Sequence, residues 1–384
     1  MKALAVVAVL AALPVTAHAD ELDGTGTVIF TRGTSLYRTD PRGKGETEIA
    51  TLPAKVAVRA LRTDARGTVL LADLAGSWSW MKLDGSASSL SPLPCADGPA
   101  QLAVDGACVL CRSTTNPSGS VIVNLATGKQ VPIPVPPPGA RLIGLHAGRR
   151  LVWADATGVW SSPPGNPKAK QQVAPEAPLR SFLPSPDGKR ATGVYLDKVF
   201  EGRTSKPAEV FTTFALDGQG ARRKLIKTGV PIEWSHDGAW LLVQDGGSAC
   251  IISATGGQYK CWKGYTGASV SPDGRYALLL GDRASASDGD KSKKSSKKKG
   301  DKKSDKKKKP ASRDADDDED APEPTGEAET AGGDMGSHGD DVEVPLPTGP
   351  LALYRAKLEG AFTDRPARII SVIDGAAVWV PPSP

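Results

Sequence analysis

The sequence predicts an all-β fold, a seven-bladed β-propeller of four-stranded antiparallel blades, from three observations. The chain has 42 glycines and 32 prolines among 384 residues, and polar turn clusters recur along it. No long segment has the apolar period of about 3.6 residues that a helix needs. A unit of four short strands recurs roughly every 36–50 residues, which is the sequence pattern of a propeller.

Tight hairpins mark the first two strands of each unit. The pattern Ser-x-Asp-Gly occurs at residues 185–188, 235–238 and 271–274. Where proline occupies x, it fixes the backbone φ that the first turn position needs. Aspartate tolerates the backbone angles of the second position, and glycine supplies the positive φ that closes the turn. Weaker copies of this hairpin lie earlier in the chain, at residues 62–67, 104–106 and 146–148.

Each hairpin is followed by a third strand and then by a more polar fourth strand. We expect third strands at residues 78–85, 120–128, 210–218 and 248–257. A four-stranded blade has two apolar faces, and a closed ring buries both faces of every blade at once. The eight tryptophans fall at blade strands, so we expect them to pack between blades rather than to form a sugar-stacking surface.

The two ends of the chain are expected to share one blade. Residues 26–32, 34–40 and 47–52 supply strands two, three and four of a first blade that lacks its innermost strand. At the far end, residues 349–358 and 367–372 complete the last blade. The remaining segment, residues 375–381, is then the missing innermost strand, which locks the ring. The count becomes seven blades, with six or eight as the alternatives.

The N-terminus has the pattern of a cleaved secretory signal. Met1 and Lys2 are a short polar start, residues 3–15 are apolar, and Ala17-His18-Ala19 places small residues where a signal peptidase reads them. We expect residues 1–19 to be removed. The apolar run is too short to span a bilayer, and the first cysteine is Cys95, so neither a membrane anchor nor a lipid anchor is expected. The mature chain is expected in a periplasm or outside the cell.

A charged insertion interrupts the last blade. Residues 284–343 contain a lysine block followed by an acidic block, with almost no apolar residues, a composition that predicts disorder. The insertion therefore divides the propeller into residues 20–283 and residues 344–384, and it joins strands two and three of blade seven. The net charge of +5 sums these opposed blocks. A long loop costs little here, because loop-closure entropy grows only logarithmically with length.

The insertion has two possible roles, a solvated loop or an electrostatic tether. In the second, the lysine block would attract surfaces rich in phosphate or carboxylate groups, with a strong dependence on salt. The lysines named for this contact are Lys291, Lys297, Lys302 and Lys307. The acidic block could also fold back on the lysines and mask them.

The five cysteines fit an oxidising compartment. Cys250 and Cys261 flank a predicted hairpin, and residues placed symmetrically about a turn face each other at a separation that a disulfide spans. Cys95 can pair with Cys111 or with Cys108, of which we name Cys111. Cys108 and Cys111 lie three residues apart on one strand, so their side chains point to opposite faces. An odd count leaves at least one thiol free, and the Cys-x-x-Cys spacing alone is a weak zinc signal.

Catalytic patterns are scarce, so no catalytic, metal-binding or cofactor-binding residue is named. His146, His236 and His338 are the histidines after the signal, and His236 is interpreted as a turn residue. The sequence has neither a Gly-x-Ser-x-Gly elbow nor a phosphate-binding loop. We therefore expect a non-catalytic scaffold that binds a protein or a glycan in the cell envelope. The alternative is a lactonase-like or lyase-like propeller enzyme with carboxylates converging at the central channel.

The two faces of the propeller are expected to differ. The Asp-Gly hairpins lie at one face, and the connections between strands two and three lie at the other. The longest connections are a loop over residues 197–208 in blade five and the charged insertion in blade seven. We expect this second face to bind, with Lys198, Phe200 and Arg203 as contacts. The expected partner of this monomer is a protein or an acidic envelope polymer, with peripheral contact to an anionic surface, but neither nucleic acid nor a small-molecule substrate.

The hairpin sequences resemble the repeats of TolB-type, WD-like bacterial propellers. The resemblance is carried by Trp-Ser-x-Asp-Gly at residues 234–238 and by Ser-Pro-Asp-Gly at residues 185–188 and 271–274, and it covers most of residues 25–283 and 345–384. It implies a propeller fold and a protein contact in the periplasm. TolB itself has a separate α/β domain before its propeller, whereas here only a few residues separate the signal from the first strand.

Overall fold

The computed structural model describes residues 25–282 and 351–382, apart from short gaps. The gaps are residues 54–55, 117–118, 135, 137–138, 147–148, 167, 176–178, 180–181, 202–203, 217–222, 225–228, 256–258 and 359–364. The described residues all belong to one compact unit. The expected signal peptide, the whole of the charged insertion with its four named lysines, and Arg203 lie outside the described residues.

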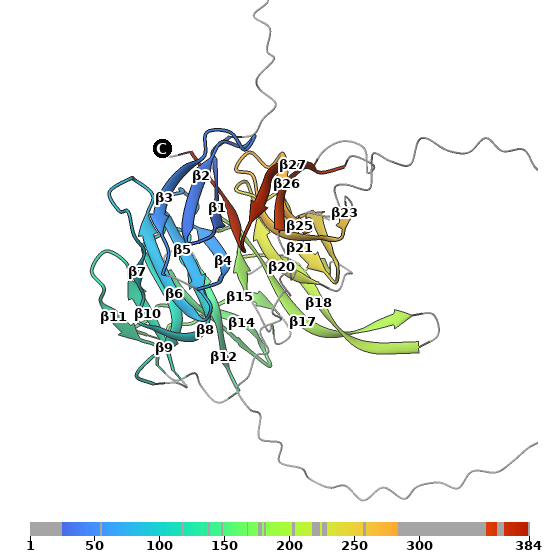
Figure 1. Ribbon diagram of the computed structural model, residues 1–384. Helices are drawn as coiled ribbons and strands as arrows, with labels where there is room; N and C mark the ends of the chain where they lie inside the picture. The colour runs from blue at the N-terminus through green and yellow to red at the C-terminus, as the bar shows by residue number, and fades with distance from the viewer. Residues whose placement is uncertain are drawn as a thin grey trace, which may run out of the picture. The chain divides into compact units, whose positions relative to one another are not determined.

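Within the described residues, the strands form seven four-stranded antiparallel sheets (Figure 1). The first sheet joins the two ends of the chain. Its strands, in spatial order, are β28 (Ala377–Val380), β1 (Thr27–Arg32), β2 (Ser35–Thr39) and β3 (Thr47–Thr51). Thr27 lies opposite Val380, and Phe30 lies opposite Ala377. The predicted closure of the ring by the C-terminal strand is therefore confirmed.

The second, third and fourth blades follow in chain order, each from its innermost to its outermost strand. Blade two comprises β4 (Val58–Thr63), β5 (Val69–Leu74), β6 (Ser77–Lys82) and β7 (Ser91–Pro92). Blade three comprises β8 (Cys95–Leu102), β9 (Cys108–Ser113), β10 (Ser120–Asn124) and β11 (Gln130–Pro132). Blade four comprises β12 (Arg141–His146), β13 (Arg150–Asp155), β14 (Gly158–Ser162) and β15 (Gln171–Pro175).

The remaining three blades repeat this order. Blade five comprises β16 (Leu183–Pro184), β17 (Arg190–Glu201), β18 (Thr204–Ala215) and β19 (Arg223–Lys224). Blade six comprises β20 (Val230–Trp234), β21 (Trp240–Asp245), β22 (Ser248–Ser253) and β23 (Tyr259–Lys263). Blade seven comprises β24 (Tyr265–Val270), β25 (Tyr276–Asp282), β26 (Leu351–Lys357) and β27 (Ala367–Ile373).

Apolar side chains fill every interface between neighbouring blades. Successive residues of a strand face opposite sides of a sheet, so β1 sends Ile29 into the interface with blade two and Phe30 into the interface with blade seven. In the described part of the chain, seven such clusters connect the seven blades in sequence and return to the first. Burial of both faces of each sheet is thus what holds the ring together.

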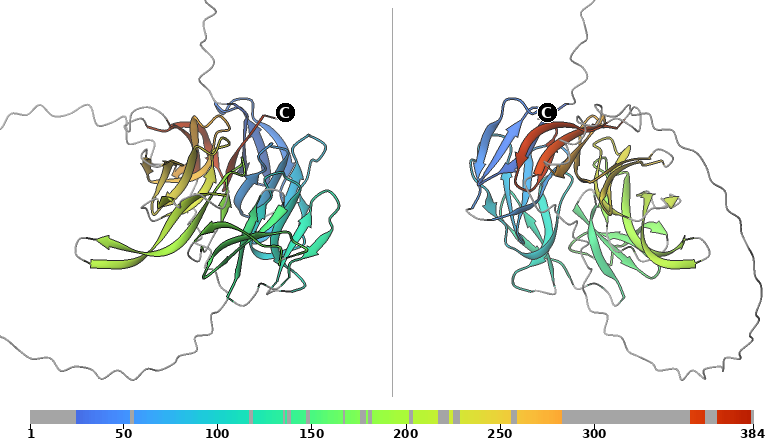
Figure 2. Two further views of the ribbon diagram at one scale, coloured as in Figure 1. Left: turned by 180° about the vertical axis from the view of Figure 1, so that it is seen from behind. Right: turned by 45° about the vertical axis from the view of Figure 1, so that its right-hand side comes forward.

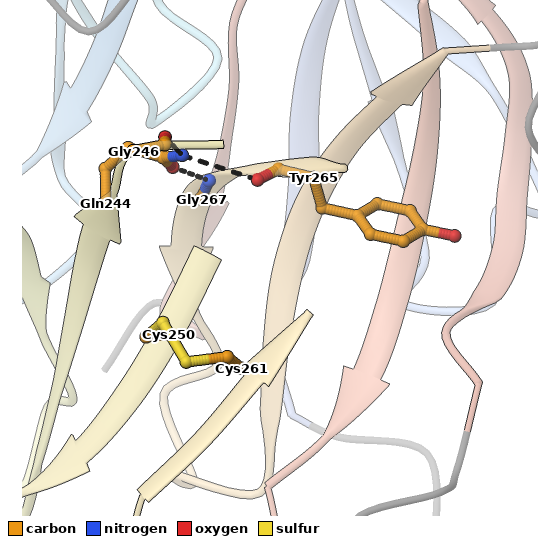
Figure 3. Close-up of a disulfide and its surroundings, with 6 residues drawn as sticks. All are labelled: Gln244, Gly246, Cys250, Cys261, Tyr265 and Gly267. Carbon is orange, nitrogen blue, oxygen red and sulfur yellow. Dashed lines mark hydrogen bonds between the residues drawn. A yellow bond between two sulfur atoms is a disulfide. The ribbon is translucent and has the colours of Figure 1, made fainter. Parts of the chain in front are cut away.

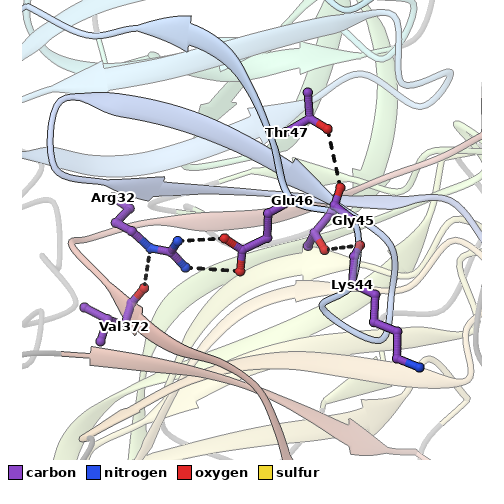
Figure 4. Close-up of polar contacts among 7 residues, drawn as sticks. Arg32, Lys44, Gly45, Glu46, Thr47 and Val372 are labelled. Carbon is purple, nitrogen blue, oxygen red and sulfur yellow. Dashed lines mark hydrogen bonds and ion pairs between the residues drawn. The ribbon is translucent and has the colours of Figure 1, made fainter.

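A polar contact reinforces the seam between blades one and seven. Arg32, the last residue of β1, forms a two-pronged ion pair with Glu46 at 2.6 and 3.2 Å (Figure 4). Its Nε also donates to the backbone carbonyl of Val372 in β27, at 3.0 Å. The same side chain therefore contacts both blades at the point where the ends of the chain meet.

Blade five departs from the sequence prediction. A loop was expected over residues 197–208, but β17 pairs with β18 along its whole length, from Arg190 opposite Ala215 to Glu201 opposite Thr204. Lys198 and Phe200 therefore lie in a strand and not in a loop. The neighbouring strands are short: β16 pairs only with Ala191 and Thr192, and β19 only with Thr212 and Thr213. Figures 1 and 2 show the rest of this hairpin, in light green, projecting beyond the sheet.

Candidate functional site

Three blades close their first hairpin with the same set of hydrogen bonds. In blade six, the hydroxyl of Ser235 donates to Asp237 Oδ1 at 2.6 Å and accepts the backbone N–H of Trp240 at 2.8 Å. Gly238 completes the turn with a φ of 66°. The equivalent serines and aspartates of blades five and seven, Ser185, Asp187, Ser271 and Asp273, make the same contacts.

Blade two builds the turn with an aspartate at the serine position. Asp64 is buried, and its Oδ1 accepts the N–H groups of Thr68 at 2.7 Å and Val69 at 2.8 Å. One carboxylate thus replaces the paired serine and aspartate of the other turns. Because these backbone bonds satisfy the buried oxygens, turn structure alone accounts for Asp64.

The turns of neighbouring blades contact one another. A Cβ atom on Gly238 of blade six would lie 3.5 Å from Asp187 of blade five, and one on Gly274 of blade seven would lie 3.4 Å from Asp237. First strands of most neighbouring blades also lie next to each other. The first hairpins therefore form a continuous rim around the centre of the ring, at one end of the strands.

This rim encloses a cavity of about 750 Å³, and each of the seven blades supplies at least one lining residue. The volume is in the range of small-molecule sites. Prolines at the turns form part of the wall, among them Pro186, Pro272 and Pro381. The ionisable lining residues are Arg66, Asp105, His146, Arg149 and His236. Two arginines and two histidines therefore stand against one carboxylate.

Arg149 and Asp105 form an ion pair at the wall of the cavity. Arg149 Nε lies 3.4 Å from Asp105 Oδ2, with the two side chains 48% and 43% exposed. An exposed pair of this kind holds its partners weakly. On the other side of blade three, the exposed Arg66 of blade two has no acidic partner in the described part of the chain. The lining consequently carries an excess of positive charge.

The backbone of Arg149 is unusual. Its φ is 61°, a left-handed value that costs a residue with a Cβ atom roughly 1 kcal/mol. Five other blades place glycine at this point of the turn, with φ between 64° and 68°: Gly67, Gly106, Gly188, Gly238 and Gly274. Blade four thus puts a long cationic side chain into a glycine position at the edge of the cavity.

Two disulfides join the cysteine pairs named from the sequence. Cys250 and Cys261 lie directly opposite each other on β22 and β23 and are bonded (Figure 3). Cys95 and Cys111 are bonded across β8 and β9. Cys108 is a buried thiol, and burial raises its pKa to about 11. Cys108 and Cys111 belong to different interfaces, as their spacing on one strand predicts.

Polar side chains of the inner strands cross the blade boundaries. Gln244 of blade six accepts the N–H of Gly267 in blade seven at 3.0 Å and donates to the carbonyls of Gly246 and Tyr265 at 2.7 and 3.5 Å (Figure 3). Gln101 of blade three makes a similar pair of bonds with the backbone of Leu145 in blade four. These bonds fix the blades that position the cavity wall.

The cavity and the contacts named from the sequence lie at opposite ends of the strands. The turn before β17 borders the cavity through Pro186, whereas Lys198 and Phe200 lie toward the far end of β17. Sequence reasoning missed the cavity lining, and it interpreted His236 as a turn residue alone. The x position of Ser-x-Asp-Gly could have indicated this lining, because Pro186, His236 and Pro272 occupy it and line the cavity. The same turn in successive blades of a ring lies at the same mouth.

Acidic groups do not dominate this mouth. Asp105 is the one carboxylate among the described lining residues, and it is paired with Arg149. Among the described residues, no three His, Cys, Asp or Glu side chains are grouped as a metal site requires. The described residues also contain no helix with the length and apolarity needed to cross a membrane.

Fold and site together define the class of this protein, a seven-bladed β-propeller with a basic cavity at one mouth. No protein-family model and no curated protein matches the sequence. Among solved structures, TolB from Acinetobacter baumannii is similar, with 11% identity, a TM-score of 0.42, and 60% of this chain and 62% of that chain covered. This chain therefore spans less than two thirds of that TolB chain.

Two enzymes are similar to this chain to about the same degree as TolB. The dihydro-heme d1 dehydrogenase NirN has 17% identity and a TM-score of 0.43, with 71% of this chain and 72% of that chain covered. The hydrazine synthase of Kuenenia stuttgartiensis has 13% identity and a TM-score of 0.39, with 59% and 75% covered. Likenesses this distant carry no functional argument.

Proposed function

We propose that this chain is an exported, non-catalytic propeller that binds a protein partner in the cell envelope. The signal-peptide pattern and the two disulfides support export, because disulfides persist in a periplasm or outside the cell. The cavity supports binding rather than catalysis, since arginines, histidines and prolines around a single paired carboxylate hold a ligand by charge and shape.

The observation that carries the proposal is the projecting part of the hairpin β17–β18. Beyond residues 191–192 and 212–213, no strand of the described chain pairs with either outer edge of this hairpin. An isolated two-stranded hairpin is marginally stable in water, and an open edge invites another strand. A partner that covers the hairpin would relieve both problems.

The chemistry of an open edge favours a protein over a glycan. Its alternating N–H and C=O groups are matched by the backbone of an extended peptide that adds a strand. Pro207 lacks an N–H group and so interrupts the donors of β18, whereas β17 has no proline between Arg190 and Glu201. We therefore propose the edge of β17 as the contact, on the face that the sequence analysis also favoured.

A shortened hairpin tests this function. Residues 196–209 are replaced by Asn-Gly, which closes a two-residue hairpin between Tyr195 and Val210, a pair that lies directly opposite. The matched control keeps the hairpin at full length and carries only the change Gly202→Asn, which leaves the expected contact Arg203 in place. Both variants and the wild type are used to capture cross-linked partners from the native envelope.

The shortened variant should keep the wild-type melting temperature within a few degrees and lose the captured protein, whereas the control should retain it. Equal capture by the shortened, folded variant would overturn the assignment to the hairpin. Capture that survives protease treatment but not glycosidase treatment would reassign the partner to a glycan. A second variant without Ser287–Asp341 shows whether the charged insertion contributes to the same capture.

A further inference from the structure

The cavity at the rim is independent of the projecting hairpin and has its own chemistry. Seven blades contribute to one concavity of about 750 Å³, so its wall is fixed by the whole ring and not by one loop. Charges in a concave wall act together on an entering ligand, because the surrounding protein focuses their field. The two arginines of the lining favour a negatively charged group.

The ion pair in the wall leaves the charge of one arginine uncompensated. Asp105 offsets only one of the two arginines, at the long distance of 3.4 Å and with both side chains about half exposed. A bound oxyanion could approach the outer N–H groups of the Arg149 guanidinium without removing Asp105, since the planar fork carries five donors. Arg66 and His236 are exposed at the same mouth and add further donors.

The backbone at Arg149 is a second, separate observation. Glycine occupies this left-handed position in five of the other blades, and glycine adopts it without strain. Strained backbone of this kind concentrates at ligand-binding sites, where the side chain is needed at that point. In blade four the strained residue is the arginine that lines the cavity.

We propose that this cavity is a binding site for the oxyanion of a small solute, a carboxylate or a phosphate, with Arg149 and Arg66 as its charge partners. The exposed His236 supplies a further hydrogen-bond donor around the anion. Arg149 would form charge-assisted, two-pronged hydrogen bonds with one pair of oxygens. The turn prolines give the mouth a rigid edge that keeps the arginines in place.

Isothermal titration calorimetry on the full-length mature protein tests the site at low ionic strength, with inorganic phosphate, citrate and chloride as the three probes. The variants are Arg149→Gly and Arg66→Gln, with Lys129→Gln as a control on the exposed turn before β11. Melting temperatures are measured for each variant in the absence of anions.

The wild type should bind citrate or phosphate but not chloride, and the stronger of the two identifies the solute class. Arg149→Gly should weaken binding about tenfold or more while raising the melting temperature by about 1–4 °C, because glycine suits the left-handed turn. Arg66→Gln should weaken binding as well, and the Lys129 variant should behave as wild type.

A purely structural Arg149 would give the higher melting temperature with unchanged affinity, and that outcome would overturn the proposal. Absence of binding by the folded wild type to both citrate and phosphate at millimolar concentrations would overturn it too. The shortened hairpin leaves the cavity residues in place, so loss of partner capture and loss of anion binding are separable results.

Discussion

Glu233 shows how one side chain reports on the interface between two blades. It lies in β20, and its Oε2 accepts the backbone N–H of Val270 in blade seven at 2.8 Å. The neighbouring Ser269 in turn accepts the N–H of Trp379 at 3.0 Å. Burial raises the pKa of Glu233 to about 7, and it outweighs the hydrogen bonds from Ser269 and Val270 and the charge of Arg62, which lower it. The acid is therefore partly protonated near neutral pH.

This raised pKa predicts a dependence of stability on pH. The folded value lies above the ordinary value of 4.5, so folding favours the protonated acid, and the stability present at low pH is lost as the pH rises through about 7. Part of the side chain surface remains open, so we expect a loss of about 1–3 kcal/mol between roughly pH 5 and 8. Urea unfolding across this range measures it.

The matched variant is Glu233→Gln, which keeps a similar shape but does not titrate. Its free energy of unfolding should fall less over the same pH range than that of the wild type. Parallel curves for the two proteins would show that Glu233 is not the source of the dependence. Single residues of this kind could not be predicted from the sequence, because the pKa of Glu233 depends on β24 and on the closing strand β28.

Turn residues were more predictable than Glu233, but only in part. The glycines of Ser-x-Asp-Gly have the positive φ that the motif requires. Arg149 has the same φ without a glycine, and no local preference of arginine indicates this. Its position follows from the pairing of His146 with Arg150, which leaves three residues for the turn.

The Cys250–Cys261 disulfide belongs to the scale of single elements. β23 is the outermost strand of blade six and pairs only with β22 in the described chain. The bond closes a short loop, with a sequence separation of 11, and loops of this size correspond to about 2–3 kcal/mol. We expect the double variant Cys250→Ala, Cys261→Ala to lose this free energy of unfolding.

Hydrogen exchange locates the effect of this double variant. Amides of β23 should exchange faster, while those of β20 and β21 should change less, because the outer strand is released first. Cys108→Ala serves as the control, since it removes a buried cysteine and keeps both disulfides. An unchanged exchange rate in β23 would mean that sheet pairing alone holds the strand.

The hairpin β17–β18 is the element that sequence reasoning assigned wrongly. Strands were recognised by apolar alternation, which arises when one face of a strand is buried. A hairpin that extends beyond its sheet has no such requirement, so residues 197–208, with their charges and Pro207, were expected to form a loop. Ladder hydrogen bonds need no apolar pattern, and the pairing continues to Glu201 and Thr204.

At the scale of the whole molecule, counting strands predicted the closed ring. The first blade lacked an innermost strand and the chain ended with an unassigned one, so the two could be matched without knowing their contacts. The cavity could not be predicted in this way. Its lining comes from six turns and from the two segments beside β1 and β28, spread from Thr25 to Pro382, and only the closed ring brings them together.

Closure gives the last prediction, which concerns Trp379. This side chain is 1% exposed, its Nε1 donates to the carbonyl of Thr25 at 2.9 Å, and its ring stacks on Tyr276 of blade seven with centroids 6.3 Å apart. Trp379→Ala should therefore lower the free energy of unfolding by about 3–5 kcal/mol, as measured by urea denaturation.

The strands in which hydrogen exchange rises first show whether Trp379 holds the ring closed or acts as an ordinary core residue. Each blade is buried on both faces by its neighbours, so opening the seam at β28 exposes blades one and seven first. Hydrogen exchange of the Trp379 variant should rise in β1 and β24 before it rises in β13 of blade four. Trp153, 5% exposed between blades three and four, is the comparison, and Trp153→Ala should instead raise exchange first in β9 and β13. The same exchange pattern in both variants would mean that the ring unfolds as one unit, with no special role for the shared blade.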